Sequence, residues 1–127
     1  MGQGQMGAQL LVADDESDVR EFIAKFFRRR KIEVVTVNDG DEAVKAVVEQ
    51  RPQVVLLDIK MDKMDGIEAL KRIRELDKQV KVVMVTGRDD EEAKQKTKAL
   101  GAYDFVHKPL EIDELEKVVL KLLEKAR

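Results

Sequence analysis

Five short apolar runs alternate with segments of helical periodicity along this chain of 127 residues. The apolar runs predict β-strands at residues 9–13, 32–37, 53–57, 80–85 and 103–106. Because each strand leads into a helical segment through a short connection, the strands are expected to be parallel, with helices on both faces of the sheet. Strands that are buried on both faces have continuous apolar sequences, as these do. The sequence therefore predicts an α/β fold with a doubly wound, five-stranded parallel sheet.

Capping residues indicate where several of the predicted helices begin and end. Ser17 is expected to cap the first helix, and Asp65 to open the third. The fourth helix, at residues 89–100, should end at Gly101 in a left-handed cap. The apolar stripe of this helix consists only of Ala93, Thr97 and Leu100. We therefore expect the fourth helix to pack loosely against the rest of the domain.

Composition limits the classes of protein to which the chain can belong. Its length suits one domain, predicted at residues 9–127, preceded by a flexible leader or cloning remnant at residues 1–8. The chain has no Cys and one His, which excludes thiolate and multi-histidine metal sites. Charged residues make up 39% of the chain but nearly cancel at a net charge of −2. This balance, with no apolar stretch of membrane-spanning length, predicts a cytoplasmic protein without direct nucleic-acid or membrane binding.

Polar residues with matching chemistry follow or end the predicted strands. Asp14 and Asp15 follow the first strand, Asp58 the third, Thr86 the fourth and Lys108 the fifth. In open parallel sheets, such residues meet at the carboxyl edge, where ligands bind. Two carboxylates about 4 Å apart repel by about 4 kcal/mol at an effective dielectric constant near 20, so a cation is expected among them. Mg²⁺ suits an all-oxygen site, and together with the amine and the hydroxyl it can bind a phosphoryl group.

Several motifs in this order resemble the receiver domain of two-component response regulators, over residues 9–127. The motifs are Val12-Ala13-Asp14-Asp15-Glu16, Leu57-Asp58-Ile59-Lys60-Met61, Met64-Asp65-Gly66, Val85-Thr86-Gly87, Gly101-Ala102 and His107-Lys108-Pro109. Each motif is weak alone, but the set is specific. The resemblance implies a flavodoxin-like (βα)5 fold, similar to the chemotaxis regulators, with strand order 2-1-3-4-5.

The resemblance also implies a phosphorylation site and its metal ligands. Asp58 would accept a phosphoryl group from a phosphohistidine on a sensor histidine kinase, from a phosphotransfer protein or from a small phosphodonor. Asp15 would bind Mg²⁺ directly and Asp14 mainly through water, and Asp58 would be a further ligand. The backbone carbonyl of Lys60 would complete the protein ligands. The domain would be a signalling switch that assists its own phosphorylation and dephosphorylation, and not an enzyme that turns over external substrates.

Further residues would stabilise the phosphoryl group and transmit the signal of phosphorylation to the protein surface. Lys108 would pair with the phosphoryl oxygens, and the Lys108-Pro109 bond would be cis. Thr86 would bond to a phosphoryl oxygen and move towards it, and Phe105 would then turn inward as the switch aromatic. This change would alter a surface formed by residues 89–100, 103–106 and 111–126. A downstream effector, an output domain or a second copy in a homodimer would bind that surface.

Some positions depart from the family pattern or need another interpretation. Asp62 stands where the family usually has Pro, so the loop after the third strand could differ in geometry. Lys60 and Arg88 lie two residues past Asp58 and Thr86, at positions that flank the path of attacking water in the family. They are expected to tune phosphoryl lifetime. Glu16 is expected to be a solvated acid in the first turn of a helix.

Three other functions stay open as alternatives. The first is a receiver-like interaction module that works without phosphorylation, which the intact acid set does not favour. The second is an Asp-nucleophile phosphatase, but the haloacid-dehalogenase type needs a second Asp where Lys60 stands. The third is a nucleotide- or flavin-binding module, which would need a Gly-rich loop where Asp14-Asp15-Glu16 stands. Since the chain ends with the last helix, it is expected to be a stand-alone receiver or a fragment of a larger regulator.

Overall fold

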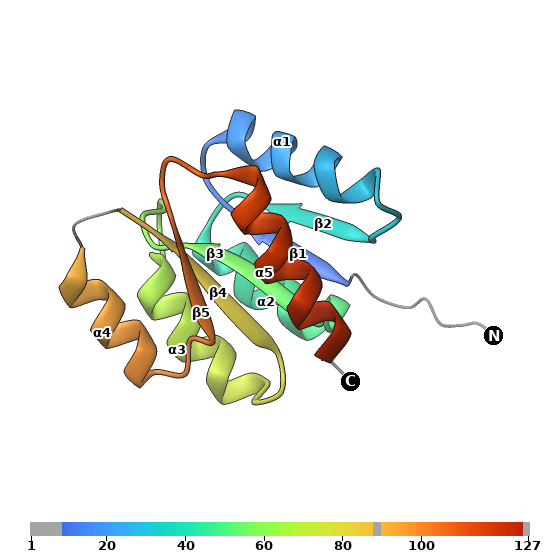
Figure 1. Ribbon diagram of the computed structural model, residues 1–127. Coiled ribbons are helices and arrows are strands. Elements are labelled where there is room, and N and C mark those ends of the chain that lie inside the picture. Colours follow the sequence, from blue (N-terminus) through green and yellow to red (C-terminus); the bar gives the residue numbers. More distant parts are fainter. Residues whose placement is uncertain (1–8, 88–89, 126–127) are drawn as a thin grey trace.

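The computed structural model describes residues 9–87 and 90–125, in which five strands form one parallel sheet flanked by five helices (Figure 1). The strands are β1 (Leu10–Ala13), β2 (Val34–Val37), β3 (Val54–Asp58), β4 (Lys81–Thr86) and β5 (Asp104–His107). The helices are α1 (Ser17–Arg28), α2 (Gly40–Gln50), α3 (Gly66–Leu76), α4 (Glu91–Ala99) and α5 (Ile112–Lys125). The strand order β2-β1-β3-β4-β5 confirms the predicted fold and topology. The leader predicted at residues 1–8 lies outside the described residues.

Two hydrophobic cores, one on each face of the sheet, account for the continuous apolar strands. One core lies between the sheet and helices α1 and α5, and the other between the sheet and helices α2, α3 and α4. Along β1, Leu10 and Val12 belong to the first core, whereas Leu11 and Ala13 belong to the second. All four side chains are buried, because successive residues of a strand point to opposite faces and both faces are covered.

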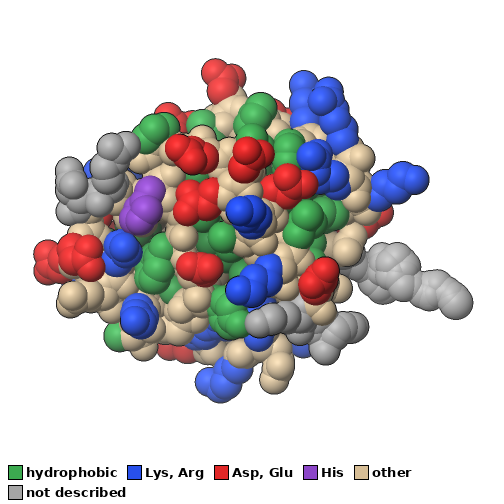
Figure 2. All heavy atoms as spheres, in the orientation of Figure 1, with side chains coloured by type: hydrophobic (Ala, Val, Ile, Leu, Met, Phe, Trp, Pro, Cys, Tyr) green, Lys and Arg blue, Asp and Glu red, His purple; other side chains and the backbone are tan. Residues whose placement is uncertain are grey.

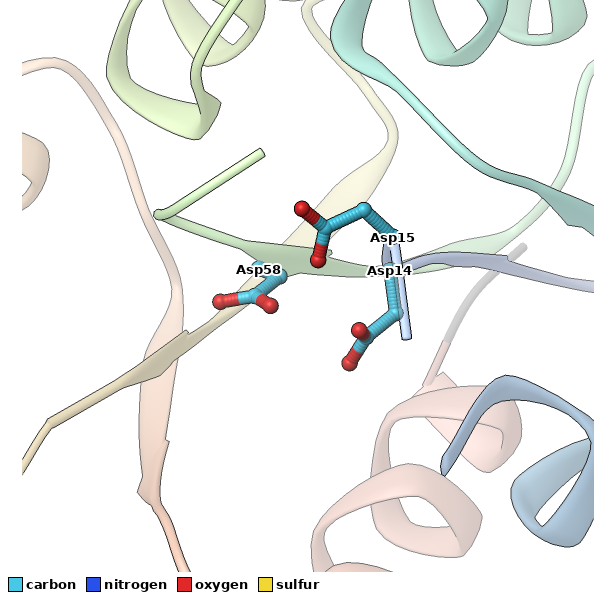
Figure 3. Close-up of side chains that lie close together, drawn as sticks. All are labelled: Asp14, Asp15 and Asp58. Carbon is cyan, nitrogen blue, oxygen red and sulfur yellow. The ribbon is translucent and has the colours of Figure 1, made fainter. Parts of the chain in front are cut away.

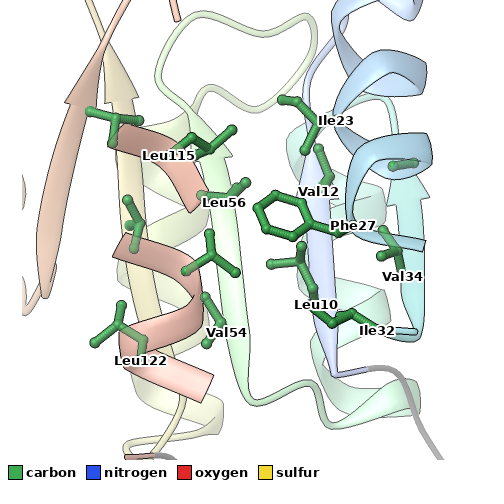
Figure 4. Packing of buried hydrophobic residues seen from close by; sticks show 14 of the residues in the cluster. Leu10, Val12, Ile23, Phe27, Ile32, Val34, Val54, Leu56, Leu115 and Leu122 are labelled. Atoms are coloured by element: carbon green, nitrogen blue, oxygen red, sulfur yellow. The ribbon is translucent and has the colours of Figure 1, made fainter. Parts of the chain in front are cut away.

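The ring of Phe27 anchors α1 to the sheet in the first core (Figure 4). It is fully buried and makes an edge-to-face contact with Phe26 at a ring-centroid distance of 5.0 Å. Ile23, one turn earlier, is also buried, whereas Phe22 is 60% exposed. The helix therefore buries the stripe formed by Ile23 and Phe27, while Phe22 lies beside it on the surface.

Most predicted boundaries agree with the structure to within one or two residues, and two differences have a clear cause. Ser17 does not cap α1. It is the first helical residue, and Glu16 occupies the N-cap position. The second strand begins at Val34 and not at residue 32, because the chain first completes a turn in which Lys31 adopts a left-handed φ of 64°. Asp65 caps α3 as predicted, with its carboxylate accepting a hydrogen bond from the backbone amide of Glu68.

Helix α4 is held to the domain by a small contact. Within its described length only Ala93 and Thr97 are buried, and the Thr97 hydroxyl donates to the carbonyl of Ala93 at 2.9 Å. Asp90 caps its N-terminus, and the predicted start at residue 89 lies outside the described residues. Gly101 adopts a φ of 102°, which confirms the predicted left-handed cap. The sparse apolar contact agrees with the expected loose packing.

Charged side chains cover much of the surface. Figure 2 shows acidic and basic groups interspersed on the face that carries α1 and α5. Among the described residues, none of the helices combines the length and the apolar character needed to cross a membrane.

Candidate functional site

Three carboxylates meet at the carboxyl edge of the sheet, as the sequence predicts. Asp14 and Asp15 follow β1, and Asp58 is the last residue of β3 (Figure 3). One carboxylate oxygen from each of the three residues lies within 4.8 Å of the other two. Asp14 and Asp58 are buried, whereas Asp15 is exposed. The cluster thus combines two acids fixed by the core with one that faces solvent, an arrangement in which a hard divalent cation could be held.

Lys108 supplies the positive charge that faces this cluster. Its Nζ donates to Asp58 Oδ2 at 3.0 Å and lies 3.6 Å from Asp14 Oδ2. Nζ also donates to Glu16 Oε1 at 2.9 Å. Glu16 is solvated as expected, with a side chain that is 60% exposed, but the expectation did not include its bond to Lys108. Sequence could not reveal this contact, because it joins residues 92 positions apart.

Backbone amides hold the two buried acids in place. The amide of Glu16 donates to Asp14 Oδ1 at 2.9 Å, and the amide of Lys60 donates to Asp58 Oδ1 at 3.3 Å. Each acid accepts this hydrogen bond from the residue two positions later, so the turn after each strand fixes its own carboxylate. The side chain of Lys60 is exposed and borders the same pocket.

Thr86 lies where a group attached to Asp58 could reach it. It is buried as the last residue of β4, and its hydroxyl donates to the carbonyl of Gly87 at 3.3 Å. Thr86 lines a pocket together with the three groups Asp15, Asp58 and Lys108. Asp90, the cap of α4, lines it as well, and the sequence did not single it out.

Phe105 lies on β5, and the Lys108-Pro109 bond follows that strand directly. The Phe105 ring is half-buried against the core that contains α4, with Lys94 Nζ at 5.7 Å from its centroid. The Lys108-Pro109 peptide bond is cis, as predicted. The inward turn of Phe105 stays a prediction, as does the metal-binding role of the Lys60 carbonyl. Arg88 lies outside the described residues.

Burial and charge make Asp58 an unusual carboxyl group. Burial, together with the negative charge of Asp14, raises its pKa from an ordinary 3.8 to about 6, although Lys108 acts in the opposite direction. For Lys108, burial lowers the pKa, but hydrogen bonds to Glu16 and Asp58 and the charges of Asp58 and Asp14 outweigh it and raise the pKa overall. Lys108 is therefore a permanent cation beside an acid whose ionised form is destabilised by its surroundings.

Two glycines allow the loop after β3 to pack closely against its neighbours. A β-carbon on Gly66 would overlap the carbonyl oxygen of Asp58 and lie 2.7 Å from the Cα of Ile59. The Gly66 amide donates to the Ile59 carbonyl at 2.8 Å. A β-carbon on Gly40 would overlap the carbonyl of Met64. The start of α3 thus rests directly on the backbone that carries Asp58, which explains why Gly follows Asp65.

The loop between these contacts accommodates Asp62. This residue is exposed, and the following Lys63 adopts a left-handed φ of 64°. Lys63 Nζ lies 3.6 Å from Asp39 Oδ2, which joins the loop to the start of α2. With Asp62 in place of Pro, Asp58 still lies beside Lys108 and the acids that follow β1.

The site therefore groups the three clustered carboxylates with the Lys108 ammonium group and the Thr86 hydroxyl beside a pocket at the carboxyl edge of the sheet. Glu16, Lys60 and Asp90 also line this pocket. The acids could bind a divalent cation through oxygen. The amine and the hydroxyl can donate hydrogen bonds to an anionic group attached to Asp58. This arrangement suits reversible transfer of a phosphoryl group to a carboxylate.

Comparisons with known proteins agree with this chemistry. A family model described as the response regulator receiver domain matches residues 10–120. The chain is 34% identical over 118 residues to sporulation initiation phosphotransferase F of Bacillus subtilis (strain 168). This match covers 93% of this chain and 95% of that protein. It is also 34% identical to regulatory protein AtoC of Escherichia coli (strain K12), covering 91% of this chain but only 25% of AtoC. Among solved structures, the Francisella response regulator 1452 receiver domain has a TM-score of 0.86 and 30% identity, with 95% of this chain and 100% of that chain covered. The chain therefore belongs to the response regulator receiver domain family.

Proposed function

We propose that the protein is a signalling switch activated by phosphorylation of Asp58. The observation that carries this proposal is the position of the Asp58 carboxylate. It is buried at the end of β3, hydrogen-bonded to Lys108 at 3.0 Å, and grouped with the two acids that follow β1. Membership of the receiver family supports the same general role.

In the proposed reaction, a carboxylate oxygen of Asp58 attacks the phosphorus atom of the donor. A new O–P bond forms while the bond from phosphorus to the leaving group breaks. With acetyl phosphate as donor, the products are the acyl phosphate of Asp58 and acetate. With a phosphohistidine donor, the imidazole leaves with the electron pair of the P–N bond. Lys108 stabilises the charge on the phosphoryl oxygens throughout, and Thr86 donates to one of them once the group is attached.

The acid cluster fits a resident Mg²⁺ ion. Oxygen ligands in a partly exposed site that leaves room for water are what Mg²⁺ prefers, and Asp14, Asp15 and Asp58 offer them. The Lys60 carbonyl is the further ligand we propose. The bound ion would supply charge neutralisation between the acids and the phosphoryl oxygens. Asp58 and Asp15 would contact it directly, and Asp14 mainly through water.

The signal would leave the site through β4 and β5. Thr86 would move towards the phosphoryl group, and Phe105 would then turn into the space behind it. Because α4 is held by few buried residues, its position should respond to this change. The surface formed by α4, β5 and α5 would then bind a downstream effector, an output domain or a second copy of the chain.

The proposed partners upstream are a sensor histidine kinase or a phosphotransfer protein, in the cytoplasm. The relative from Bacillus subtilis, which matches nearly the whole chain, is itself named a phosphotransferase. This likeness supports a place in a phosphorelay. Other relatives, such as AtoC, are much longer than the match, so an attached output domain is also part of the proposal.

Phosphorylation can be tested directly with a small donor. Incubation with acetyl phosphate and Mg²⁺ should add one phosphoryl group per chain, detected as a mass increase of the intact protein. We expect Asp58→Ala to show no increase, while Asp65→Asn, which neutralises an exposed acid in the same loop region and keeps the N-cap of α3, should be modified like the wild type. A wild-type protein that stays unmodified, yet binds a partner through α4, β5 and α5, would favour the module that works without phosphorylation.

Lys60 should influence how long the phosphoryl group persists. Its exposed side chain borders the pocket that contains Asp58, where an ammonium group can hold phosphoryl oxygens or hinder water. We expect Lys60→Ala to change the first-order rate of phosphoryl loss after the donor is removed, and a further change when Arg88 is also neutralised. Loss of phosphoryl can be followed by intact mass over time, with Lys63→Ala as the control in the same loop. Equal lifetimes for Lys60→Ala and the wild type would contradict this role.

A further inference from the structure

Glu16 occupies a position for which its side chain is poorly suited. It is the N-cap residue of α1, with an extended backbone conformation (φ −89°, ψ 109°). Ser, Thr, Asp and Asn are strongly preferred at N-caps because their short side chains reach back to the first helical amides. Within the described chain, Glu16 makes no such side-chain hydrogen bond. By contrast, the N-caps of α2, α3 and α4 are all Asp, and each one accepts a hydrogen bond from its helix.

The Glu16 carboxylate is directed instead towards the phosphorylation site. Its Oε1 accepts a hydrogen bond from Lys108 Nζ at 2.9 Å, slightly shorter than the 3.0 Å bond from the same Nζ to Asp58. Lys108 therefore bridges the start of α1 and the end of β3. Glu16 also borders both the pocket over Asp58 and a second, mostly apolar pocket between α1 and the loop after β5. A cap that breaks the local preference and contacts a reactive group points to a role in that group's function.

From these contacts, we infer that Glu16 is a positioning residue that holds the Lys108 ammonium group over the phosphoryl-accepting oxygen of Asp58. This inference rests on the proposed function. Lysine has a long, flexible stem that loses substantial rotamer entropy when it is fixed. The Lys108 side chain is 29% exposed, so burial alone does not fix it. A second carboxylate at hydrogen-bond distance restricts Nζ before the donor arrives.

Glu16 also provides an anchor that the reaction itself does not alter. When Asp58 is phosphorylated, one of its oxygens becomes bonded to phosphorus, and Lys108 has to shift to the phosphoryl oxygens. The contact with Glu16 can persist through that shift, because Glu16 lies outside the bond-forming atoms. Orientation of a reacting group contributes to rate only if the group is held in place during the reaction.

Glu16→Asp separates this role from helix capping and from simple charge. Asp retains the negative charge and is among the best N-cap residues, so α1 should be as stable as in the wild type or more stable. Its carboxylate is one methylene shorter and should no longer hold Lys108. We expect the rate constant for phosphorylation by acetyl phosphate at saturating Mg²⁺ to fall by about three- to tenfold, as expected for losing part of one charge-assisted hydrogen bond. The midpoint of thermal unfolding should stay equal or rise.

Asp18→Asn is the matched control. Asp18 is an exposed acid in the first turn of the same helix and borders the same apolar pocket, but it has no hydrogen bond or ion pair with Lys108 among the described residues. It should be phosphorylated at the wild-type rate. We expect Lys108→Ala to be phosphorylated slowly. In that background Glu16→Asp should cause no further decrease in the rate, because the contact through which Glu16 acts is already gone.

The outcomes distinguish this inference from the proposed function. A wild-type protein that acetyl phosphate does not modify at Asp58 would overturn the proposed function and the inference with it. A wild type that is modified, with Glu16→Asp modified equally fast, would overturn the inference alone. A slow Glu16→Asp that is slowed equally in the Lys108→Ala background would also overturn it, because Glu16 would then act independently of Lys108.

Discussion

Gly66→Ala is expected to lower the free energy of unfolding by about 3 kcal/mol, the upper part of the usual range for overpacking a tight site. The new methyl group would overlap the Asp58 carbonyl oxygen and lie 2.7 Å from the Cα of Ile59. Both neighbours are backbone atoms, so no flexible side chain can move aside. Ala is a better helix former than Gly by about 1 kcal/mol, which offsets only part of this cost. Urea unfolding followed by circular dichroism would measure the change as a lower midpoint with an unchanged slope.

Gly87→Ala is the control for the substitution itself. A β-carbon at Gly87 would meet no atom of the described residues within 4 Å, so we expect its stability to stay within about 0.5 kcal/mol of the wild type. Gly66→Ala should also slow phosphorylation, because the backbone it displaces is the backbone that positions Asp58. If Gly66→Ala were as stable as Gly87→Ala, the start of α3 would not rest on β3 as closely as the structure indicates.

The fold was largely predictable because each strand has a short apolar sequence that can be recognised without knowing the rest of the structure. The run Val54–Leu57 is apolar throughout because β3 lies in the middle of the sheet and is covered on both faces. Strand ends were less predictable. Asp58 and Thr86 are polar, so the sequence predicts that they follow their strands. Each is instead the last residue of its strand and is paired within the sheet. A buried polar residue at a functional edge contradicts the apolar pattern from which a strand is recognised.

Contacts between distant segments mark the limit of sequence reasoning about the site. Asp14, Asp15, Asp58 and Lys108 could be grouped beforehand, because parallel strands bring their carboxyl ends to one edge. The same rule says nothing about the direction of a side chain in the loops. The sequence around Glu16 is typical of an ordinary acid in the first turn of a helix. Only the path of the loop after β5 brings Lys108 Nζ to 2.9 Å from Glu16 Oε1.

Asp58→Asn is expected to raise the stability of the unphosphorylated protein at pH 7.5 without Mg²⁺, by about 2 kcal/mol. Burial raises the pKa of Asp58 from 3.8 to about 6, so the folded state favours the protonated form. The wild type should therefore lose stability as the pH rises from about 4 to about 6. Above pH 6 it should stay less stable than it is below pH 4. The full effect of this pKa difference is about 3 kcal/mol, and screening by solvent in the open pocket beside Asp58 reduces it.

An uncharged Asn mimics the protonated acid and does not titrate. Urea unfolding at several pH values should therefore show little difference between variant and wild type below pH 4 and a growing difference up to about pH 6. Asp65→Asn is the control, because Asn caps helices as well as Asp does and Asp65 is exposed. This substitution should change the free energy of unfolding by no more than about 0.5 kcal/mol.

Added Mg²⁺ should stabilise the wild type more than Asp58→Asn, because a bound cation favours the ionised carboxylate. The difference in free energy of unfolding between the two proteins should therefore become smaller. If Asp58→Asn were instead the less stable protein at pH 7.5, the bond between Lys108 and Asp58 would outweigh the burial of the charge. The expected result means that the free protein holds the Asp58 carboxylate in an unfavourable charged state. Binding of a cation would then relieve a cost that the fold already carries at Asp58.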